Sequence, residues 1–426
     1  MLSGWSTKGK LACPICNKDT CSFTLKNGQK QCYMGHRRFL DSQHSWRKSK
    51  KFDGKSEYRS KPEELSGDDV LRQLRQVENV RFGKPPNQRK RKRSDGELNW
   101  TKRSIFFELP YWKTLKLRHN LDVMHIEKNI CENILSTLMN IEKKTKDNIK
   151  TRLDLEELGI RKELHLQRGG DRLWVPQACY TLTLQERRKL CGWLGLVKLP
   201  DGYGSKFSRV VANDAAKVSG MKSHDYHIFL QRLLPAASYG FLRKDVYVAL
   251  SELSNFFKEL CSKVVNREKL ELLKHDIILI LCKLEMIYPP SFFVIMVHLA
   301  IHLPREVELG GPVQYRWMYF VERLLRTLKD SVRNKARPEG SIAEAYIAKE
   351  CLNFCSMYFR GIETRFNRED RNYDGSKTDE SSGFLIFKQK TRPLGAAKYK
   401  VLSKSERDKI QWYILHNCSE IDAYRK

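Results

Sequence analysis

The sequence predicts a mainly α-helical protein with a small Cys- and His-rich α+β part at its N-terminus. After Met221, apolar residues recur at the spacing of helices, whereas the alternation typical of strands is sparse throughout the chain. Residues 1–48 differ, because they combine Cys, Gly, Lys and aromatic residues with few long apolar runs. That composition is typical of a compact zinc knuckle.

Length and composition exclude several classes of protein. The 426 residues are 41% hydrophobic, which is enough for a sizeable core. No apolar run reaches the roughly 18 residues of a membrane helix, and no signal-peptide pattern opens the chain. We therefore expect an intracellular protein with no membrane partner. Its 12 cysteines then favour free thiols or a metal site over a disulfide framework.

The charge is strongly basic and uneven. The net charge is +29, and residues 1–120 alone hold 28 basic and 12 acidic side chains. This excess predicts a polyanionic partner, DNA or RNA, although a generally adhesive basic protein has the same composition. The densest run of basic residues follows Pro85 and Pro86. Three interpretations fit it: a nuclear import signal, a phosphate-contacting arm or a solvated linker. It consists of Arg89, Lys90, Arg91, Lys92 and Arg93.

Changes in composition, together with Gly and Pro residues that break regular structure, divide the chain into five segments. They are a zinc-knuckle-like segment (1–48), a basic polar linker (49–103), a helical core or insertion region (104–220), a helical C-terminal domain (221–365), and a mobile segment ending in a strand and a helix (366–426). Periodicity predicts helices over 67–80, 123–142, 222–235, 241–263, 267–287, 291–303, 314–335 and 341–360, and a strand over 384–390 followed by a helix over 405–424.

Two sets of side chains have the spacing of metal ligands. Cys13 and Cys16 form a Cys-x-x-Cys turn, and Cys32 and His36 complete a local Cys3His set. The alternative for these residues is a set of ordinary buried cysteines. His298 and His302 form an i, i+4 pair that presents both imidazoles on one helix face. Two histidines hydrogen-bonded within a helical core are the alternative there.

Three further residues are candidates for a functional role, and each also has a simple structural explanation. Asp122 and His125 lie at the start of a helical pattern, so Asp122 is either a helix cap or part of a metal or DNA contact. Glu322 adjoins the apolar stripe of its helix, four residues before Arg326. On spacing alone, Glu322 and Arg326 would form a surface ion pair that stabilises the helix by only a few tenths of a kcal/mol.

Several long strings together resemble the transposase of plant CACTA (En/Spm-type) elements. The resemblance covers almost the whole chain, including the helical domain of unknown function that accompanies these proteins. The strings that carry it are "LSGWSTKGKLACPIC", "CYMGHRRFL", "ELPYWKTLKLRHNLDVMHIEKNICENIL", "TKDNIKTRLDLEELGIRKELH", "LLPAASYG" and "YPPSFFVIMVHLAIHLPREVELGGPVQYRWMYFVERLLRTLK".

The resemblance implies a DDE recombinase with an RNase H-like core, interrupted by a helical insertion. In such enzymes three acidic residues hold two divalent ions, Mg²⁺ or Mn²⁺. The matching positions make Glu322 the third acid. They also imply a structural Zn²⁺ ion held by Cys13, Cys16, His298 and His302, in place of the local set. Asp122 and His125 match a further motif of the family.

The chain departs from the family pattern before Cys13. Both catalytic Asp residues should precede the Cys pair, yet residues 1–12 contain no Asp or Glu. We therefore expect a partial RNase H-like transposase, truncated and inactive as a nuclease, with residual DNA and zinc binding in the nucleus and contacts to other transposase copies. A zinc-dependent DNA-binding or regulatory protein domesticated from a transposase is the alternative.

Overall fold

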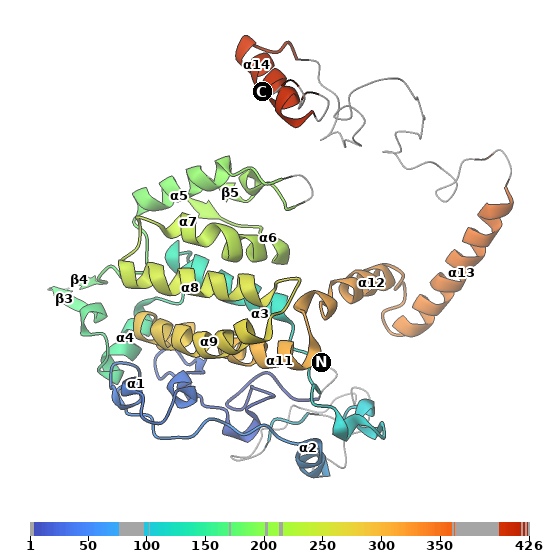
Figure 1. Cartoon of the computed structure of the whole chain (residues 1–426). Helices are drawn as coiled ribbons and strands as arrows, with labels where there is room; N and C mark the ends of the chain where they lie inside the picture. The colour runs from blue at the N-terminus through green and yellow to red at the C-terminus, as the bar shows by residue number, and fades with distance from the viewer. Residues whose placement is uncertain are drawn as a thin grey trace. The chain divides into compact units, whose positions relative to one another are not determined.

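The computed structural model describes residues 4–75, 98–101, 103–169, 172–200, 203–212, 216–359, 362, 400–418, 421 and 424. The chain divides into two compact units, Met1–Tyr319 and Phe320–Lys426. The predicted, mainly helical architecture is confirmed (Figure 1). None of the described helices is both long enough and apolar enough to cross a membrane.

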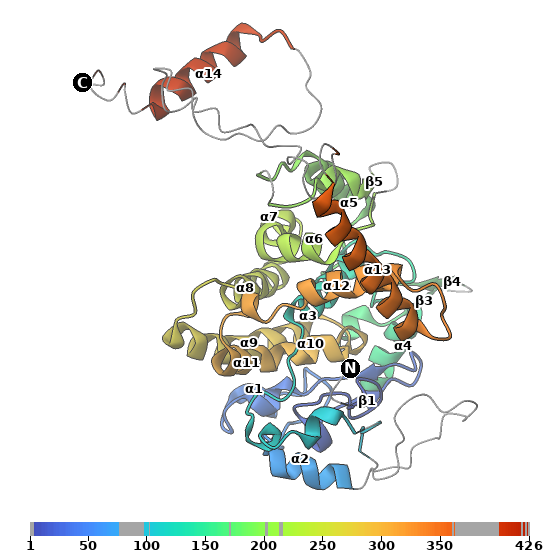
Figure 2. The ribbon, with the colours of Figure 1, turned by 90° about the vertical axis from the view of Figure 1, so that its right-hand side faces the viewer.

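The first unit is a stack of helices around α3 (Val123–Leu138). On one side α3 packs against α6 (Ser223–Ile228), and on another against α10 (Ile295–Leu299). The long helices α8 (Lys244–Leu260) and α9 (Arg267–Ile287) lie side by side, as Figures 1 and 2 both show. This arrangement places α10 in the interior, where its side chains meet the N-terminal segment.

Local sequence explains the limits of α3. The Asp122 side chain caps it by accepting a hydrogen bond from the backbone N–H of His125 at 3.0 Å. Ile126, Ile130 and other apolar side chains on one face are buried in the core. The helix ends at Leu138 and not near residue 142 as the periodicity predicts, since Asn140 adopts a left-handed φ of 47°.

The prediction for the chain around Pro304 was wrong in one respect. The helix expected over 291–303 is only a short α10, followed by a 3-10 turn and then by α11 (Leu303–Gly310). Pro304 lies in the first turn of α11, where its missing N–H would have no partner in any case. Pro304 therefore helps to start a helix.

The N-terminal segment joins the main core and does not form a separate knuckle. Its strands and helix are short: β1 (Phe23–Thr24), β2 (Gln31–Cys32) and α1 (Ser45–Lys48). The helix α2 (Gly67–Leu74) follows in the predicted linker and packs in a separate small cluster with Trp5 and Trp100. The backbone N–H of Tyr33 donates to the carbonyl of Phe293 at 2.8 Å, just before α10. Cys13, Cys16, Tyr33 and Met34 are buried in the same hydrophobic cluster as α3 and α10.

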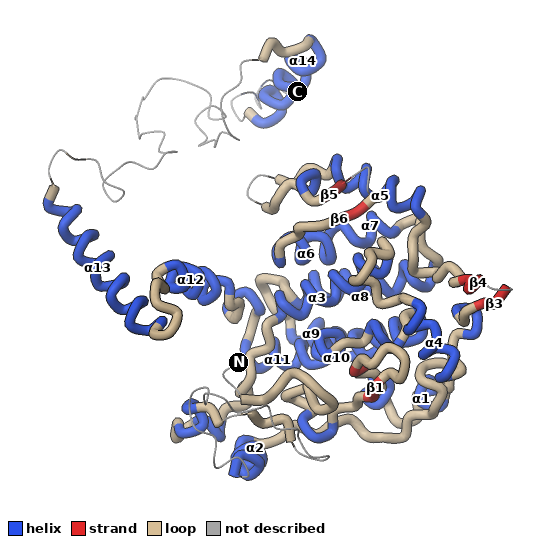
Figure 3. The backbone as a smooth tube through the Cα atoms, turned by 180° about the vertical axis from the view of Figure 1, so that it is seen from behind, coloured by secondary structure: helices blue, strands red, loops and turns tan. Residues whose placement is uncertain are grey.

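Smaller elements complete the first unit. The strands form separate antiparallel pairs, seen in red in Figure 3, and the described residues contain no larger sheet of the RNase H kind. A π-helix over Phe229–Leu233 lies between α6 and α7. The remaining elements are α4 (Ile149–Leu158), β3 (Gln167–Gly169), β4 (Arg172–Trp174), α5 (Leu184–Leu196), β5 (Val211–Ala212), β6 (Lys217–Val218) and α7 (Leu234–Ser238).

The second unit consists of separate helices with exposed apolar side chains. It contains most of α12 (Tyr319–Asp330) together with α13 (Pro338–Tyr358) and α14 (Lys404–Asn417). On α12 and α13, Leu325 and Phe354 are examples of apolar residues that remain exposed. The strand predicted over 384–390 lies outside the described residues.

Candidate metal centre

A tight turn directs the two cysteine thiols into the core. The backbone N–H of Asn17 donates to the carbonyl of Cys13 at 3.0 Å, and the N–H of Cys16 donates to the Cys13 sulfur at 3.3 Å. Asn17 leaves the turn with a left-handed φ of 51°, a conformation that Asn tolerates better than most residues. Reciprocal amide hydrogen bonds with Gln73, at 3.0 and 3.1 Å, hold Asn17 there.

The two histidines come from the other end of the first unit. His298 lies in α10, and His302 ends the 3-10 turn that follows it. Their ring centroids are 5.2 Å apart and the rings are inclined by 75°. Phe39 packs edge-on against His302, with a centroid distance of 6.2 Å. The imidazoles are therefore oriented by packing before any ion is considered.

These four side chains, here called the Cys13 group, converge on one point. The Cys13 sulfur lies 3.3 Å from Nε2 of His302, and the Cys16 sulfur lies 3.3 Å from Nε2 of both His298 and His302. All four donor atoms lie within 4.8 Å of one another. Across a tetrahedral zinc ion with normal bond lengths, sulfur and nitrogen would be about 3.6 Å apart. The group can therefore hold a metal ion with little rearrangement.

The electrostatics of the thiols fit a cation site. The pKa of Cys13 lies well below its usual value, because the hydrogen bond from Cys16 and the nearby His302 and His298 outweigh the effect of burial. The hydrogen bond to Cys13, followed by burial, raises the pKa of Cys16 well above its usual value. The pair thus shares its remaining proton, and an ion that binds both thiolates would release it.

The alternative local ligands are engaged elsewhere. Nδ1 of His36 lies 2.6 Å from Oε1 of Glu285 on α9, and both side chains are fully buried. The Cys32 sulfur donates weakly to the carbonyl of Lys30 at 3.8 Å. His36 still approaches the group, since its ring packs 5.4 Å from that of His298. It therefore supports the wall of the site and is not among its four donors.

Among the described residues, no other predicted site residue belongs to this set of donors. Asp122 caps α3, and His125 is exposed on the same helix. Glu322 is exposed on α12 in the second unit, and no ion pair with Arg326 occurs in the part of the chain that is described. The basic run of residues 89–93 lies outside the described residues.

A cavity of about 820 Å³ adjoins the Cys13 group. His302 lines it together with Ile15, His119, Arg305 and Glu306. Burial lowers the pKa of His119 to about 4 and raises that of Glu306 to about 7. Both groups are therefore neutral over part of the range in which a histidine and a glutamate are usually charged.

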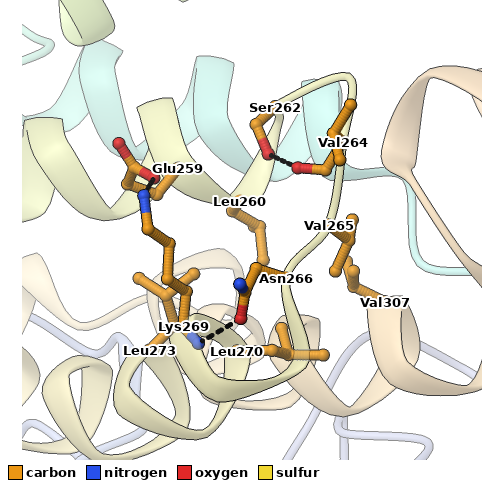
Figure 4. A pocket seen from close by; sticks show the side chains of 10 residues that line it. All are labelled: Glu259, Leu260, Ser262, Val264, Val265, Asn266, Lys269, Leu270, Leu273 and Val307. Carbon is orange, nitrogen blue, oxygen red and sulfur yellow. Dashed lines mark hydrogen bonds and ion pairs between the residues drawn. The ribbon is translucent and has the colours of Figure 1, made fainter.

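A second cavity of about 320 Å³ lies where α8 turns into α9 (Figure 4). Leu260, Leu270 and Val307 form its apolar wall, and Asn266 and Lys269 add polar atoms. The Asn266 side chain accepts hydrogen bonds from the N–H groups of Glu268 and Lys269, so it acts as the cap of α9. Of the residues predicted to be functional, none that the structure describes lines this cavity.

Sequence reasoning missed two buried polar clusters. In one, Glu127 meets His227 and Gln231, with Nδ1 of His227 2.7 Å from the carboxylate. In the other, Glu306 accepts hydrogen bonds from the backbone N–H of Leu121 and from Arg316. The first cluster joins residues 100 positions apart, so no local spacing signals it. Glu127 did lie within a conspicuous string, but nothing there indicated its partner.

Comparison with known proteins gives two matches. Residues 1–77 match the family described as Transposase family tnp2, and residues 260–373 match the domain of unknown function DUF4218. Neither the curated proteins nor the solved structures contain a match to the chain. Cys13 and Cys16 fall in the first matched segment, and His298 and His302 fall in the second. The two matches support a transposase-derived protein.

Proposed function

We propose that this chain derives from a CACTA-type (En/Spm-like) transposase of plants and acts as a zinc-stabilised DNA-binding protein. A transposase family implies DNA binding, and the net charge of +29 is consistent with a nucleic-acid partner. The proposal includes transport to the nucleus, with the basic run of residues 89–93 as the import signal. It also includes association with further transposase copies, as the resemblance implies.

The observation that carries the proposal is the position of the Cys13 group. Its cysteines lie in the segment that matches the transposase family, and its histidines lie in the segment that matches the accompanying domain. A metal ion at this point would cross-link the two matched segments within the first unit. Such a cross-link would make the fold of each segment depend on the other.

Zinc suits this donor set better than other common ions. Two thiolates and two imidazoles form the tetrahedral Cys2His2 set that zinc favours, whereas Mg²⁺ prefers oxygen ligands. With four protein ligands no coordination position is left for a substrate, so the ion would be structural. Bound zinc would stabilise the folded state.

The proposal further holds that these 426 residues do not cleave DNA by themselves. Two-metal chemistry needs clustered carboxylates. Glu322 corresponds to the third acid in the resemblance, but residues 1–12 supply no acidic partner before the Cys pair. Added Mg²⁺ or Mn²⁺ should therefore support no nicking or joining of DNA by the purified chain.

Filter binding of the full chain to duplex DNA at two salt concentrations tests the DNA part of the proposal. We expect affinity that falls steeply with salt and depends little on sequence, because phosphate contacts would dominate. Alanine at all five basic positions of 89–93 should weaken binding and should leave a fused reporter in the cytoplasm. Salt-insensitive binding would contradict the proposal, as would cleavage that disappears in Glu322→Gln.

A further inference from the structure

A second set of donor atoms lies in the first unit, away from the Cys13 group. Glu127 on α3, His227 on α6 and Cys261 at the end of α8 each offer one ligand atom. These atoms all lie within 4.8 Å of one another. We call these three residues the Glu127 group, which shares no residue with the Cys13 group.

The carboxylate of Glu127 is held at the bottom of this set. The Glu127 side chain is fully buried, whereas the His227 side chain is 16% exposed. Solvent therefore reaches the group on the side of His227. Gln231 donates to Oε1 of Glu127 at 3.0 Å and to the carbonyl of Phe257 at 3.1 Å. Both contacts fix the position of the amide, and the amide in turn fixes the orientation of the carboxylate.

An unusual stretch of backbone supports the arrangement. The π-helix over Phe229–Leu233 interrupts the helical run between His227 and the start of α7. Gln231 lies within this π-helix and contacts the same carboxylate as His227, which precedes it by four residues. π-Helical turns are rare and occur frequently at functional sites. The local distortion thus coincides with the point at which two helices present polar side chains to Glu127.

The wall beside His227 contains an unused hydrogen-bond donor. The ring of Trp317 packs edge-on against His227 with a centroid distance of 6.2 Å. Among the described residues, Nε1 of Trp317 is buried and has no acceptor. A buried donor without a partner is costly, so the Trp317 N–H needs an acceptor beyond the described atoms of the chain, such as a water molecule. A water molecule bound to a metal ion would be such an acceptor.

We infer that Glu127, His227 and Cys261 bind a second Zn²⁺ ion, with a water molecule as the fourth ligand. One carboxylate oxygen, one imidazole nitrogen and one thiolate sulfur suit zinc, which accepts all three donor types. A hydrogen-bonded pair of Glu127 and His227 would need no thiol beside it. Cys261 within reach of both is the feature that distinguishes a metal site from such a pair.

The ion would take the place of a shared proton. Without an ion, Nδ1 of His227 lies 2.7 Å from the Glu127 oxygen, which is a hydrogen-bond distance. Across a tetrahedral zinc ion these atoms would be about 3.3 Å apart, so the pair must open by roughly half an ångström. The proton between them and the proton of the Cys261 thiol would then leave to solvent. In the Cys13 group the sulfur–nitrogen distances of 3.3 Å need to lengthen less, to about 3.6 Å.

The number of zinc ions per full-length chain tests this inference. The chain is reconstituted with zinc, freed of loosely bound ions and analysed by native mass spectrometry. We expect two ions in the wild type, and one in Glu127→Gln and in Cys261→Ser. Cys131→Ser is the matched control, because Cys131 is a buried cysteine on α3 that belongs to neither group. This control should keep two ions. A wild type with one ion would overturn the inference, as would two ions in both ligand variants.

A measurement on the wild type covers the case in which the variants do not fold. Alkylation of the cysteines is followed by mass spectrometry with and without zinc. Zinc should slow the alkylation of Cys261 at least tenfold more than that of Cys191, since Cys191 is buried but lies in neither donor group of the described residues. Equal rates at Cys261 with and without zinc would contradict the second site. The outcome does not depend on DNA binding, so the two proposals fail separately.

Discussion

The sulfur of Cys13 and Nε2 of His302 lie 3.3 Å apart, although 289 positions separate them in the chain. A local ligand set would close a much shorter loop, of about 20 residues. Because loop-closure entropy grows only with the logarithm of length, the longer loop costs only about 2 kcal/mol more. Burial of the turn against α10 is enough to offset a difference of that size.

Removal of zinc should destabilise the first unit. An ion that binds only the folded state contributes about 4 kcal/mol when its free concentration is a thousand times its Kd. We therefore expect chelation to lower the denaturant midpoint of the wild type by a corresponding amount. Chemical denaturation with and without a zinc chelator measures this. A midpoint that does not change on chelation, in a chain shown to have contained zinc, would count against a structural ion.

Arg152 on α4 should be essential for stability. Its guanidinium pairs with Asp147 through two contacts, at 2.5 and 2.6 Å, and donates to the carbonyl of Leu164 at 2.7 Å. Arg152→Leu removes the cation from Asp147, whose largely buried carboxylate then keeps the Tyr180 hydroxyl as a donor. Loss of one partner of a buried pair costs about 3–5 kcal/mol. Urea denaturation gives the value. Lys26→Ala, which breaks an exposed pair with Glu157, is the control and should change stability by less than about 1 kcal/mol.

Glu306 should make the stability of the protein depend on pH. Burial raises its pKa to about 7, although the Leu121 N–H and Arg316 oppose the shift. Because the folded state keeps this proton above the ordinary pKa of about 4.5, its contribution to stability is lost as the pH rises from about 4.5 to about 7. The shift corresponds to at most about 3 kcal/mol.

Glu306→Gln should remove this dependence, since an amide does not titrate. The difference in unfolding free energy between variant and wild type should move in favour of the variant as the pH rises from 5 to 8. Denaturation at several pH values, with zinc at saturation throughout, measures that difference. Parallel stability curves for the two proteins would show that Glu306 does not titrate in this range.

Periodicity predicted the long helices well and the short ones poorly. The segment expected over 267–287 corresponds to α9, because Asn266 supplies a cap and two prolines follow the helix. The helix over 291–303 was wrong, since a 3-10 turn and Pro304 divide the run into α10 and α11. Such tightening depends on tertiary packing around the two histidines, and sequence spacing does not record it.

The candidate site, like the fold, could be predicted from the sequence only in part. Spacing alone left two ligand sets open, and the choice between them required the resemblance. The structure brings Cys13 and Cys16 to His298 and His302, and it pairs His36 with Glu285. The Glu127 group lay beyond prediction, because its donors come from three helices and no two share a local motif. Glu322 as the third acid stays a prediction.

The most direct test of the account compares cobalt binding to His302→Gln and to Cys32→Ser. In a Cys261→Ser background, where the Glu127 group has no thiolate, thiolate-to-cobalt absorption follows occupancy of the Cys13 group, and competition with a chelator gives the affinity. Since His302 contacts both sulfurs, we expect His302→Gln to weaken binding by at least a hundredfold. Cys32→Ser should stay within a few fold of the wild type. Weak binding in Cys32→Ser together with normal binding in His302→Gln would contradict the long-range metal centre.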